Sequence, residues 1–517
     1  MLFNSYTFIL LFLPVTLFVF FRIGAWGHHR IAISWLVATS LFFYGWWNPA
    51  YLGLLIGSVL FNYSVGVGLA MGSPNPSFGK KSLLAAGIAA NLAAIGYFKY
   101  ANFFVNAVNG GFNTGFELSP IILPLAISFF TFQQIAYLVD VYRGETREHN
   151  FLQYFLFVTF FPQLIAGPIV HHKEMLHQFA KDSLYKFKHE NFSVGITIFF
   201  LGLFKKVMIA DNVSQFSTPV FNAAANGTLI TFFEGWGGAL AYTFQLYFDF
   251  SGYSDMAIGL GRMFGVRLPL NFNSPYKATS IIDFWRRWHM TLSRFMLDYL
   301  YIPLGGNQRG PVRQYLNLMI TMLLGGLWHG AGWTFVIWGG LHGFYLFINH
   351  AWRSIQKSAG WNFQGRIYLL TSRLLTFLAI VAAWVMFRAD NLEAALRVYE
   401  GMAGYNGFPL NKEWMAKMTR MGPVLADWGV EPGILLIPVK RALLYWTLPL
   451  LLACWILPNT QQIMRKFDPA INFLDDPREA PFVEWTPNRR WAVAVLILAF
   501  LCLFNMTGIS EFLYFQF

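Results

Sequence analysis

Charged residues and cysteines are scarce in this sequence, and each shortage excludes a class of protein. Asp, Glu, Lys and Arg make up 12% of the 517 residues, whereas soluble domains carry about 25%. The two cysteines, Cys454 and Cys502, both lie in apolar runs. They provide neither a disulfide framework nor a thiolate metal site, and we expect no catalytic thiol. The composition therefore excludes a water-soluble globule.

Several patterns that identify soluble enzymes are also missing. The chain has no P-loop, no Gly-x-Gly-x-x-Gly in a strand-to-helix context and no Gly-x-Ser-x-Gly elbow. His171, His172, Glu174 and His177 cluster without the His-Glu-x-x-His arrangement, so we expect no metal site. The sequence shows neither an internal repeat nor a Ser/Gly linker, which predicts one domain over residues 1–517.

Apolar and aromatic residues are abundant. Hydrophobic residues form 56% of the chain, which holds 55 Phe and 19 Trp, and the mean hydropathy is +0.46. These values are typical of proteins whose solvent is mostly lipid. The N-terminal run, SYTFILLFLPVTLFVFF, lacks the basic region and cleavage site of a signal peptide, and we expect it to be a retained first helix.

Further apolar runs recur along the whole chain. They lie near residues 31–47, 51–71, 82–98, 119–139, 151–170, 192–209, 233–260, 315–328, 332–349, 369–387, 442–457 and 491–507. Because a helix needs about 20 apolar residues to cross hydrocarbon, we predict an all-α polytopic membrane protein with about 11 to 13 membrane segments. Several runs are short or broken, so we expect some segments to be tilted or re-entrant.

Two regions carry polar or small residues at an apolar depth. The run 233–260 contains Asp249, Ser251, Ser254 and Asp255. The region 315–349 contains five small residues around one histidine, His329: Gly325, Gly326, Gly330, Ala331 and Gly332. Non-helical backbone inside a membrane persists only where protein or a water-filled cavity covers it. We predict broken helices in both regions.

The net charge of +12 is concentrated in one stretch. Between Arg262 and Arg313, eight basic residues face two acidic ones, which leaves +6. The basic residues are Arg262, Arg267, Lys277, Arg286, Arg287, Arg294, Arg309 and Arg313, and the acidic ones are Asp283 and Asp298. In a membrane protein this pattern indicates a cytoplasmic loop rather than nucleic-acid binding. A loop that also binds a phosphate-bearing cosubstrate is the alternative.

His329 is the leading candidate for chemistry. It lies between Trp328 and Gly330 in an apolar run that follows a basic, Trp-rich segment. Titratable groups retained in apolar spans mark functional sites by default. Burial disfavours the charged imidazolium, which leaves a base able to take a proton from a hydroxyl or thiol. The residues alone leave open a purely structural histidine that hydrogen-bonds a neighbouring helix.

Three further residues accompany His329 in the sequence. Asp298, which precedes it at the end of the basic segment, could orient the imidazole or hold a substrate group, or form a salt bridge with Arg294. His289, in the Trp-Arg-Arg-Trp-His run, favours an anchoring role at the membrane interface. His342 follows His329, is expected on the next helical segment and is a candidate to support it.

Other polar residues in apolar surroundings are interpreted as helix-end anchors. They are Lys99 in YFKYANF, and Asp140, Tyr142 and Arg143 in YLVDVYRG.

Seven stretches of the chain match the sequence motifs of a known family. They are GYFKYANFF (96–104), ISFFTFQQIAYLVDVYRG (127–144), FFPQLIAGPIV (160–170), QLYFDFSGYSDMAIGLG (245–261), DFWRRWHMTLSRFMLDYLYIPLGGN (283–307), TMLLGGLWHGAGWTFVIWGGLHG (321–343) and WVMFRADN (384–391). The sequence resembles the membrane-bound O-acyltransferase family, and within it the membrane subunits of bacterial alginate O-acetyltransferases and their relatives. The matching core runs from about residue 96 to 391.

The resemblance implies a fold and a set of site residues. The family fold is a ring of tilted helices around a thinned centre, with a tunnel that contains the histidine. His329 matches the family's signature histidine, Asp298 matches an upstream Asn or Asp, and His289 matches a second histidine, so all three are expected to be catalytic. Arg286, Arg287, Arg294 and Trp328 are expected to bind the phosphate-bearing cosubstrate, with no metal.

The resemblance also implies a reaction and its partners. Acetyl-CoA from the cytosol is the expected cosubstrate, and a periplasmic SGNH-type O-acetyltransferase, or a similar protein of a polysaccharide export and modification complex, is the expected acceptor. The protein would be a multi-pass protein of the bacterial inner membrane, with the lipid bilayer but no nucleic acid as a further partner. Alginate is the expected polysaccharide. Alternatives are peptidoglycan, cellulose, teichoic acid or another glycan, and, in a different class, a non-catalytic polysaccharide transporter or scaffold.

Overall fold

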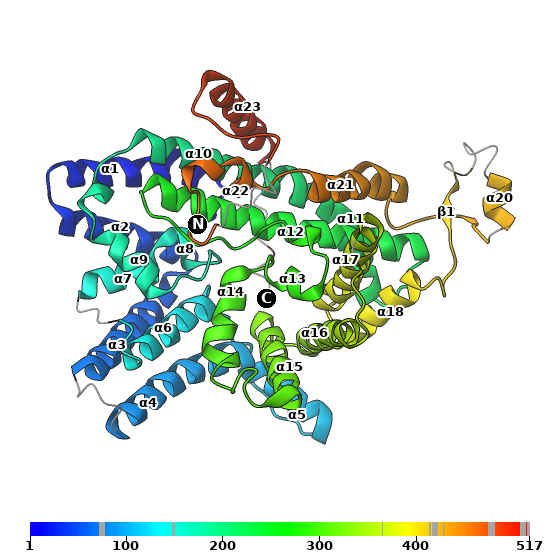
Figure 1. Ribbon diagram of the computed structural model, residues 1–517, viewed down its shortest axis with the longest axis horizontal. Coiled ribbons are helices and arrows are strands. Elements are labelled where there is room, and N and C mark those ends of the chain that lie inside the picture. Colours follow the sequence, from blue (N-terminus) through cyan, green and yellow to red (C-terminus); the bar gives the residue numbers. More distant parts are fainter. Residues whose placement is uncertain are drawn as a thin grey trace.

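The structure is a computed structural model. It describes residues 1–71, 78–146, 150–363, 365–412, 415, 422–427, 429–473, 481–506 and 513. Nearly all of the secondary structure in these residues is helical (Figure 1). One pair of two-residue parallel strands, β1 (Leu410–Asn411) and β2 (Pro432–Gly433), is the exception among the described elements.

The helices follow one another with short connections. The N-terminal part contains α1 (Leu13–Ala25), α2 (His29–Gly45), α3 (Leu52–Met71), α4 (Phe78–Ile95), α5 (Ala101–Phe112), α6 (Ile127–Tyr142), α7 (Phe151–Thr159), α8 (Phe161–Leu164) and α9 (His172–Phe179). The central part contains α10 (His189–Phe204), α11 (Asp211–Ala225), α12 (Phe232–Met263), α13 (Ile281–Trp285), α14 (Met290–Met296), α15 (Gly310–His329), α16 (Trp333–Ser358), α17 (Arg366–Arg388) and α18 (Leu392–Met402). The C-terminal part contains α20 (Gly422–Asp427), α21 (Leu448–Ile456), α22 (Thr460–Ile463) and α23 (Arg489–Asn505).

Several helices contain or adjoin turns of other helical types. The π-helical turns are η1 (Thr7–Phe12), η3 (Gly96–Tyr100), η5 (Lys205–Ala210), η7 (Leu297–Tyr301) and η8 (Arg441–Thr447). The short 3₁₀ turns are η2 (Pro49–Tyr51), η4 (Asp182–Tyr185), η6 (Pro275–Lys277) and η9 (Arg465–Phe467). π-turns within α-helices often mark functional positions; η3 contains Lys99, and η7 contains Asp298 and Tyr299.

Five helical stretches in the described part of the chain are long and apolar enough to cross a membrane. They are Thr7–Ala25, Pro49–Met71, Gly79–Phe112, His189–Ala225 and Arg366–Arg388. The prediction of an all-α, multi-pass membrane protein is therefore confirmed. The count of about 11 to 13 segments, the thinned centre and the tunnel stay predictions, because shorter helices do not reveal by length alone whether they span.

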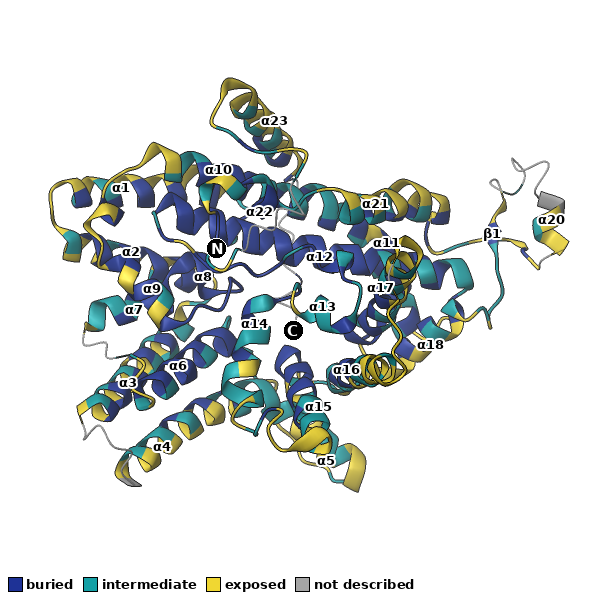
Figure 2. Cartoon of the chain, viewed as in Figure 1, coloured by how far each residue is buried: buried dark blue, intermediate teal, exposed yellow. Residues whose placement is uncertain are grey.

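Helix α12 is buried among the other helices. It packs along α10 with the two backbones close together, and Figure 2 shows it buried along most of its length. Two glycines allow this approach, since a Cβ on Gly252 would lie 2.7 Å from the carbonyl oxygen of Gly202, and one on Gly259 would lie 2.6 Å from that of Gly195. Small residues at such positions are the usual means of close helix packing in membranes.

The prediction of a broken helix within 233–260 is wrong, since α12 runs through that region without interruption. Its acidic residues are neutralised by neighbouring lysines instead. Asp249 lies 2.7 Å from Lys206, and Asp255 lies 2.6 Å from Lys205, both lysines coming from η5. A buried charge that meets an opposite charge does not require an opened backbone or a water-filled cavity.

The prediction for 315–349 is confirmed, because α15 ends at His329 and α16 begins at Trp333. Gly330 and Gly332 between them have extended backbone. A Cβ on Gly330 would collide with the ring of Phe335, so a larger residue there would displace that ring. Figure 1 shows the short helices α13 and α14 near the middle of the molecule, with longer helices around them.

Candidate active site

His329 is the last residue of α15 and is buried, with 6% of its surface exposed. Three aromatic rings from three helices surround its imidazole. The ring centroids of Trp328, Trp338 and Phe387 lie 4.9, 5.1 and 5.2 Å from that of His329. Because these rings exclude water, an electrostatic or proton-transfer event at the imidazole takes place in a medium of low dielectric constant.

Lys99 and Tyr100 hold the end of α15 on which His329 lies. The Lys99 Nζ donates to the backbone oxygens of Trp328 at 2.6 Å and His329 at 3.2 Å, and the Tyr100 hydroxyl donates to that of Leu327 at 2.8 Å. The last carbonyls of a helix lack partners within it, and a cation there is favoured by the helix dipole. Lys99 thus caps a helix that belongs to a distant part of the chain.

The interpretation of Lys99 as an anchor at the end of its own helix is therefore wrong. One signal in the sequence could have shown this, because Lys99 is an isolated cation between aromatic residues in an apolar span, and such a cation has a specific partner as a rule. The identity of that partner could not be read from sequence distance.

His289 lies beside His329. Its ring is fully buried and its centroid is 6.3 Å from that of His329. The backbone between α13 and α14 turns sharply there, with a left-handed φ of 43° at His289. Such a conformation costs about 1 kcal/mol or more in a residue with a side chain. The interpretation of His289 as a membrane-interface anchor is therefore wrong, since its ring is a buried neighbour of His329.

Asn271 fixes the tautomer of His289. The Asn271 Oδ1 accepts hydrogen bonds from the Thr291 Oγ1 at 2.9 Å and the Thr291 backbone N–H at 3.4 Å, while its Nδ2 donates to the Ser254 Oγ at 3.1 Å. A backbone N–H can only donate, so the atom it meets is the amide oxygen. The His289 Nδ1, 3.1 Å from the same oxygen, must then carry the proton, which leaves Nε2 as the basic nitrogen.

His342 forms a third member of this histidine cluster, which we define as His289, His329 and His342. Its ring lies 4.8 Å from that of Trp338, which also contacts His329, and 5.1 Å from that of Trp285. It is fully buried, and neither ring nitrogen has a hydrogen-bond partner among the described residues. His342 therefore supports the aromatic wall around His329 without a direct polar contact to it.

Asp298 and His329 have different charged neighbours. The titratable groups that act electrostatically on His329 are His289, Lys99 and His342, whereas those that act on Asp298 are Arg294, Lys173, Arg143 and Glu145. Asp298 lies on η7, the π-helical turn that follows α14 and contacts α15. The spacing of Asp298 and His329 in the sequence does not determine which face of that turn the carboxylate occupies.

Arg294 belongs to a second polar group, the Arg294 cluster, formed by Asp140, His171, Glu174, Arg294 and Tyr299. Arg294 donates two hydrogen bonds to the Glu174 carboxylate, at 2.6 and 2.9 Å. The Tyr299 hydroxyl donates to Asp140 at 2.7 Å and lies 3.2 Å from the His171 Nδ1. Asp140 is thus a buried acceptor and not the helix-end anchor inferred from the sequence.

Burial and charge set the protonation of this cluster. Burial by itself raises the pKa of Glu174, but the hydrogen bonds and charge of Arg294 outweigh it and hold that pKa below its ordinary value. Burial, followed by the charge of Arg294, lowers the pKa of His171 to about 4. At neutral pH the cluster therefore holds an ionised Glu174 and a neutral His171.

The four residues predicted to bind the cosubstrate lie in different surroundings. Arg286 is exposed, while Arg287 is half-buried and pairs with Asp283 at 2.9 Å. Arg294 is held by Glu174. Trp328 is buried and stacks on Phe132 with a centroid distance of 5.5 Å. Their role in binding stays a prediction, and of the four only Arg287 lines the cavity that is described below.

Comparison with known proteins gives the family. The family model described as the membrane-bound O-acyltransferase family matches residues 145–389. A Helicobacter pylori protein named peptidoglycan O-acetyltransferase is 47% identical over 79% of this chain and 81% of its own length. A Pseudomonas aeruginosa protein named probable alginate O-acetylase AlgI is 43% identical over 81% of this chain and 78% of its own length.

The chain belongs to the membrane-bound O-acyltransferase family. The resemblance inferred from the motifs is confirmed, and the protein is an acyltransferase. A more distant relative, a Streptococcus thermophilus protein named teichoic acid D-alanyltransferase, is 27% identical over 45% of this chain and 58% of its own length. The names of these three relatives share acyl transfer and differ in the acyl group and the polymer.

The geometry of this membrane-bound O-acyltransferase gives its histidine cluster a definite chemical capacity. The imidazoles of His289 and His329 lie side by side, and burial keeps both neutral. A neutral imidazole can accept a proton from a hydroxyl and return it to a leaving group. Lys99 holds the backbone at His329, and the hydrogen bond to Asn271 orients the ring of His289. Both contacts favour one arrangement of the reacting groups.

Proposed function

We propose that this acyltransferase moves the acetyl group of cytosolic acetyl-CoA across the bacterial inner membrane to a hydroxyl of a periplasmic partner. The partner, an SGNH-type O-acetyltransferase or a similar protein, then acetylates an exported polysaccharide, with alginate as the first candidate. The observation that carries the proposal is the position of His329, which lies buried at a capped helix end beside His289, within a family of O-acyltransferases.

In the proposed reaction, His329 is the general base. It takes the proton of the acceptor hydroxyl while the hydroxyl oxygen attacks the thioester carbonyl carbon. The carbon–sulfur bond then breaks, and the thiolate of CoA leaves with the proton that His329 holds. The ring of His289 lies beside that of His329 and stays neutral, because two imidazolium ions within this distance in a buried site would repel each other.

Two variants, each of which replaces one histidine, test the proposal. His329→Ala should lower the rate of acetyl transfer by about 10²–10⁴-fold, the usual contribution of a positioned base. His350→Ala is the matched control, because His350 lies on α16 and its ring contacts that of Tyr315, 6.2 Å away, rather than the histidine cluster. The measurement is release of CoA by the purified protein in the presence of an acceptor, together with its yield and thermal stability.

Unchanged acetyl transfer by a well-folded His329→Ala protein would exclude His329 as the base. Absence of CoA release by the wild type with every acceptor offered would exclude acetyl-CoA as the donor. The alternative of a transporter or scaffold loses its support, since the family is one of acyltransferases.

Peptidoglycan is the second candidate polymer. It is favoured by the Helicobacter pylori relative, which is named peptidoglycan O-acetyltransferase and whose identity of 47% exceeds the 43% of the Pseudomonas aeruginosa protein named probable alginate O-acetylase. The two candidates are separated by measuring ester-linked acetate on isolated peptidoglycan and on the secreted polysaccharide in cells with and without His329→Ala. The polymer whose acetate disappears is the one served.

A further inference from the structure

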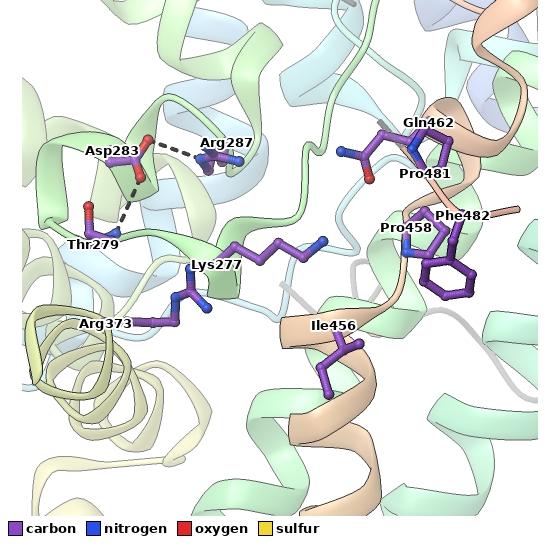
Figure 3. A pocket seen from close by; sticks show the side chains of 10 residues that line it. All are labelled: Lys277, Thr279, Asp283, Arg287, Arg373, Ile456, Pro458, Gln462, Pro481 and Phe482. Carbon is purple, nitrogen blue, oxygen red and sulfur yellow. Dashed lines mark hydrogen bonds and ion pairs between the residues drawn. The ribbon is translucent and has the colours of Figure 1, made fainter. Parts of the chain in front are cut away.

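A cavity of about 360 Å³ opens beside the segment that joins α12 to α14 (Figure 3). Its walls include Lys277 from η6, Asp283 from α13 and Arg287 from the turn after α13, together with Arg373 from α17 and Phe482 from the C-terminal part. The volume lies within the range of small-molecule sites, about 300–1,000 Å³. Segments from separate parts of the chain therefore meet at this cavity.

The described residues of the walls carry a net positive charge. Three cations, Lys277, Arg287 and Arg373, face one carboxylate, Asp283. Asp283 pairs with Arg287 at 2.9 Å and orients its guanidinium, as the dashed line in Figure 3 marks. The pair leaves an excess of two positive charges at the cavity, which suits an anionic ligand.

Arg373 is the least compensated of these cations. It lies two turns inside α17, one of the candidate membrane spans. Its Nε is buried without a hydrogen-bond partner in the described part of the chain, and its guanidinium lies over the ring of Trp455 at 5.8 Å. A charged side chain retained within a span, with no acidic partner among the described residues, indicates a functional position.

Two elements connect the cavity with the histidine cluster. On α17, Arg373 lines the cavity, and the ring of Phe387 lies 5.2 Å from that of His329. These two residues are 14 positions apart, which corresponds to about 21 Å along a helix. On α13, Asp283 lines the cavity, while the ring of its neighbour Phe284 stacks 6.1 Å from that of His342.

We propose that this cavity binds the phosphate at the end of the pantetheine arm of the acyl donor. This inference builds on the proposed function, in which the donor is a thioester. A thioester held at His329 has its phosphate one pantetheine arm away, and the separation along α17 is comparable with the length of such an extended arm. Arginine and lysine bind phosphate oxygens through charge-assisted hydrogen bonds. The same phosphate occurs in CoA and on acyl carrier proteins.

Three donors that differ in phosphate content test the proposal. They are acetyl-CoA, acetyl-phosphopantetheine, which keeps one phosphate, and acetyl-pantetheine, which has none. The wild type should use the first two with similar kcat/KM and acetyl-pantetheine about tenfold or more less efficiently, as expected from the loss of a charge-assisted contact. If acetyl-CoA works and acetyl-phosphopantetheine behaves like acetyl-pantetheine, the cavity does not hold this phosphate.

Arg373→Gln should raise the KM for acetyl-CoA and acetyl-phosphopantetheine about tenfold and leave acetyl-pantetheine unchanged. Lys277→Gln should act in the same direction, and Arg373→Lys should retain part of the preference because it keeps the charge. Arg366→Gln is the matched control, since Arg366 is an exposed arginine at the start of the same helix and does not line the cavity. It should leave all three donors unchanged.

The outcomes separate this proposal from the proposed function. If His329→Ala abolishes transfer while Arg373→Gln and Lys277→Gln affect all three donors equally or not at all, the phosphate site is wrong and the acetyl transfer stands. If the wild type uses none of the donors, the proposed function itself fails. A lipid headgroup in the cavity would instead make Arg373→Gln alter the dependence of activity on phosphatidylglycerol in nanodiscs without altering donor preference, which would overturn the proposal. A purified acetylated carrier protein that outcompetes acetyl-CoA would support the phosphate site and identify the source of the phosphate.

Discussion

The histidine cluster and the Arg294 cluster differ in the partners that their buried polar side chains have. In the histidine cluster, His289 meets the neutral amide of Asn271, and Lys99 is directed at the backbone carbonyls of a helix end. Around Arg294, an ionised carboxylate meets a guanidinium, and a second carboxyl meets a hydroxyl. A titratable side chain that is buried without an opposite charge costs free energy, and such side chains are common at reactive sites. A side chain buried in an ion pair is stabilised by its partner, which leaves it less able to react. The difference separates groups suited to chemistry from groups that hold the fold.

Removing the guanidinium of Arg294 from the Arg294 cluster should give the largest effect and is the sharpest test of this contrast. Arg294→Ala should lower the free energy of unfolding by about 3 kcal/mol, because it leaves the partly buried Glu174 without its guanidinium partner. The combined change Glu174→Ala with Arg294→Ala should cost less than the sum of the two single changes. The measurement is thermal unfolding of the purified protein in detergent. A stable Arg294→Ala protein that has lost acetyl transfer would place Arg294 in the chemistry instead.

The pH dependence of stability should report the same cluster. His171 has a folded pKa of about 4, below the value of about 6.5 for an unfolded histidine. The unfolded chain therefore binds a proton first as the pH falls, and stability should drop by about 2 kcal/mol between pH 6.5 and 4.5. The lowered pKa of Glu174 adds a loss of stability at still lower pH.

His171→Gln, which cannot titrate, should flatten the decline between pH 6.5 and 4.5. The readout is the apparent Tm across that range, compared with the wild type and with His177→Gln as a control at an exposed position of α9. An equal slope in His171→Gln would show that other groups set this dependence.

Lys99, which caps the end of α15, provides a test of the histidine cluster that concerns rate rather than stability. Lys99→Met should reduce kcat for acetyl transfer about tenfold, or about 1.4 kcal/mol, because the carbonyls of Trp328 and His329 lose their donor and the imidazole loses its fixed position. The KM for the donor should stay unchanged, and Lys99→Arg should recover part of the rate. Lys81→Met, which changes a lysine of the preceding helix α4, is the control. A change in KM alone would assign Lys99 to substrate binding.

Asp298 gives the smallest expected effect and the most direct test of the motif-based interpretation. Its charged neighbours are Arg294, Lys173, Arg143 and Glu145 and not His329, so Asp298→Asn should change the transfer rate less than about threefold and stability by less than about 1 kcal/mol. Steady-state rates and unfolding curves measure both. A loss as large as that of His329→Ala would restore Asp298 to the catalytic residues.

The helical membrane class and the central stretch of the fold could be predicted from sequence because they depend on local composition. Long apolar runs indicate spans, and the small residues after His329 indicated the break between α15 and α16, which the structure contains. The family motifs singled out His289 and His329, which the structure brings together. Each of these signals lies within a short window of the chain.

What could not be predicted depends on contacts between distant segments. The lysines of η5 pair with Asp249 and Asp255 of the continuous helix α12, and nothing within 233–260 reveals these partners. In the same way, the pairing of Arg294 with Glu174, a residue from a distant helix, engages the guanidinium that was expected to bind the cosubstrate. A spacing between two residues indicates that they can meet only when the intervening elements are known.

The hold of Lys99 and Tyr100 on α15 has a consequence for any attempt to isolate a minimal enzyme. The segment that matches the family model, residues 145–389, contains all three buried histidines of the cluster, yet neither of these two side chains lies within it. A fragment cut to that segment would keep the three imidazoles and lose the hydrogen bonds that hold the end of α15. Moving the histidine cluster into another scaffold therefore means including the helix around residues 96–112 as well.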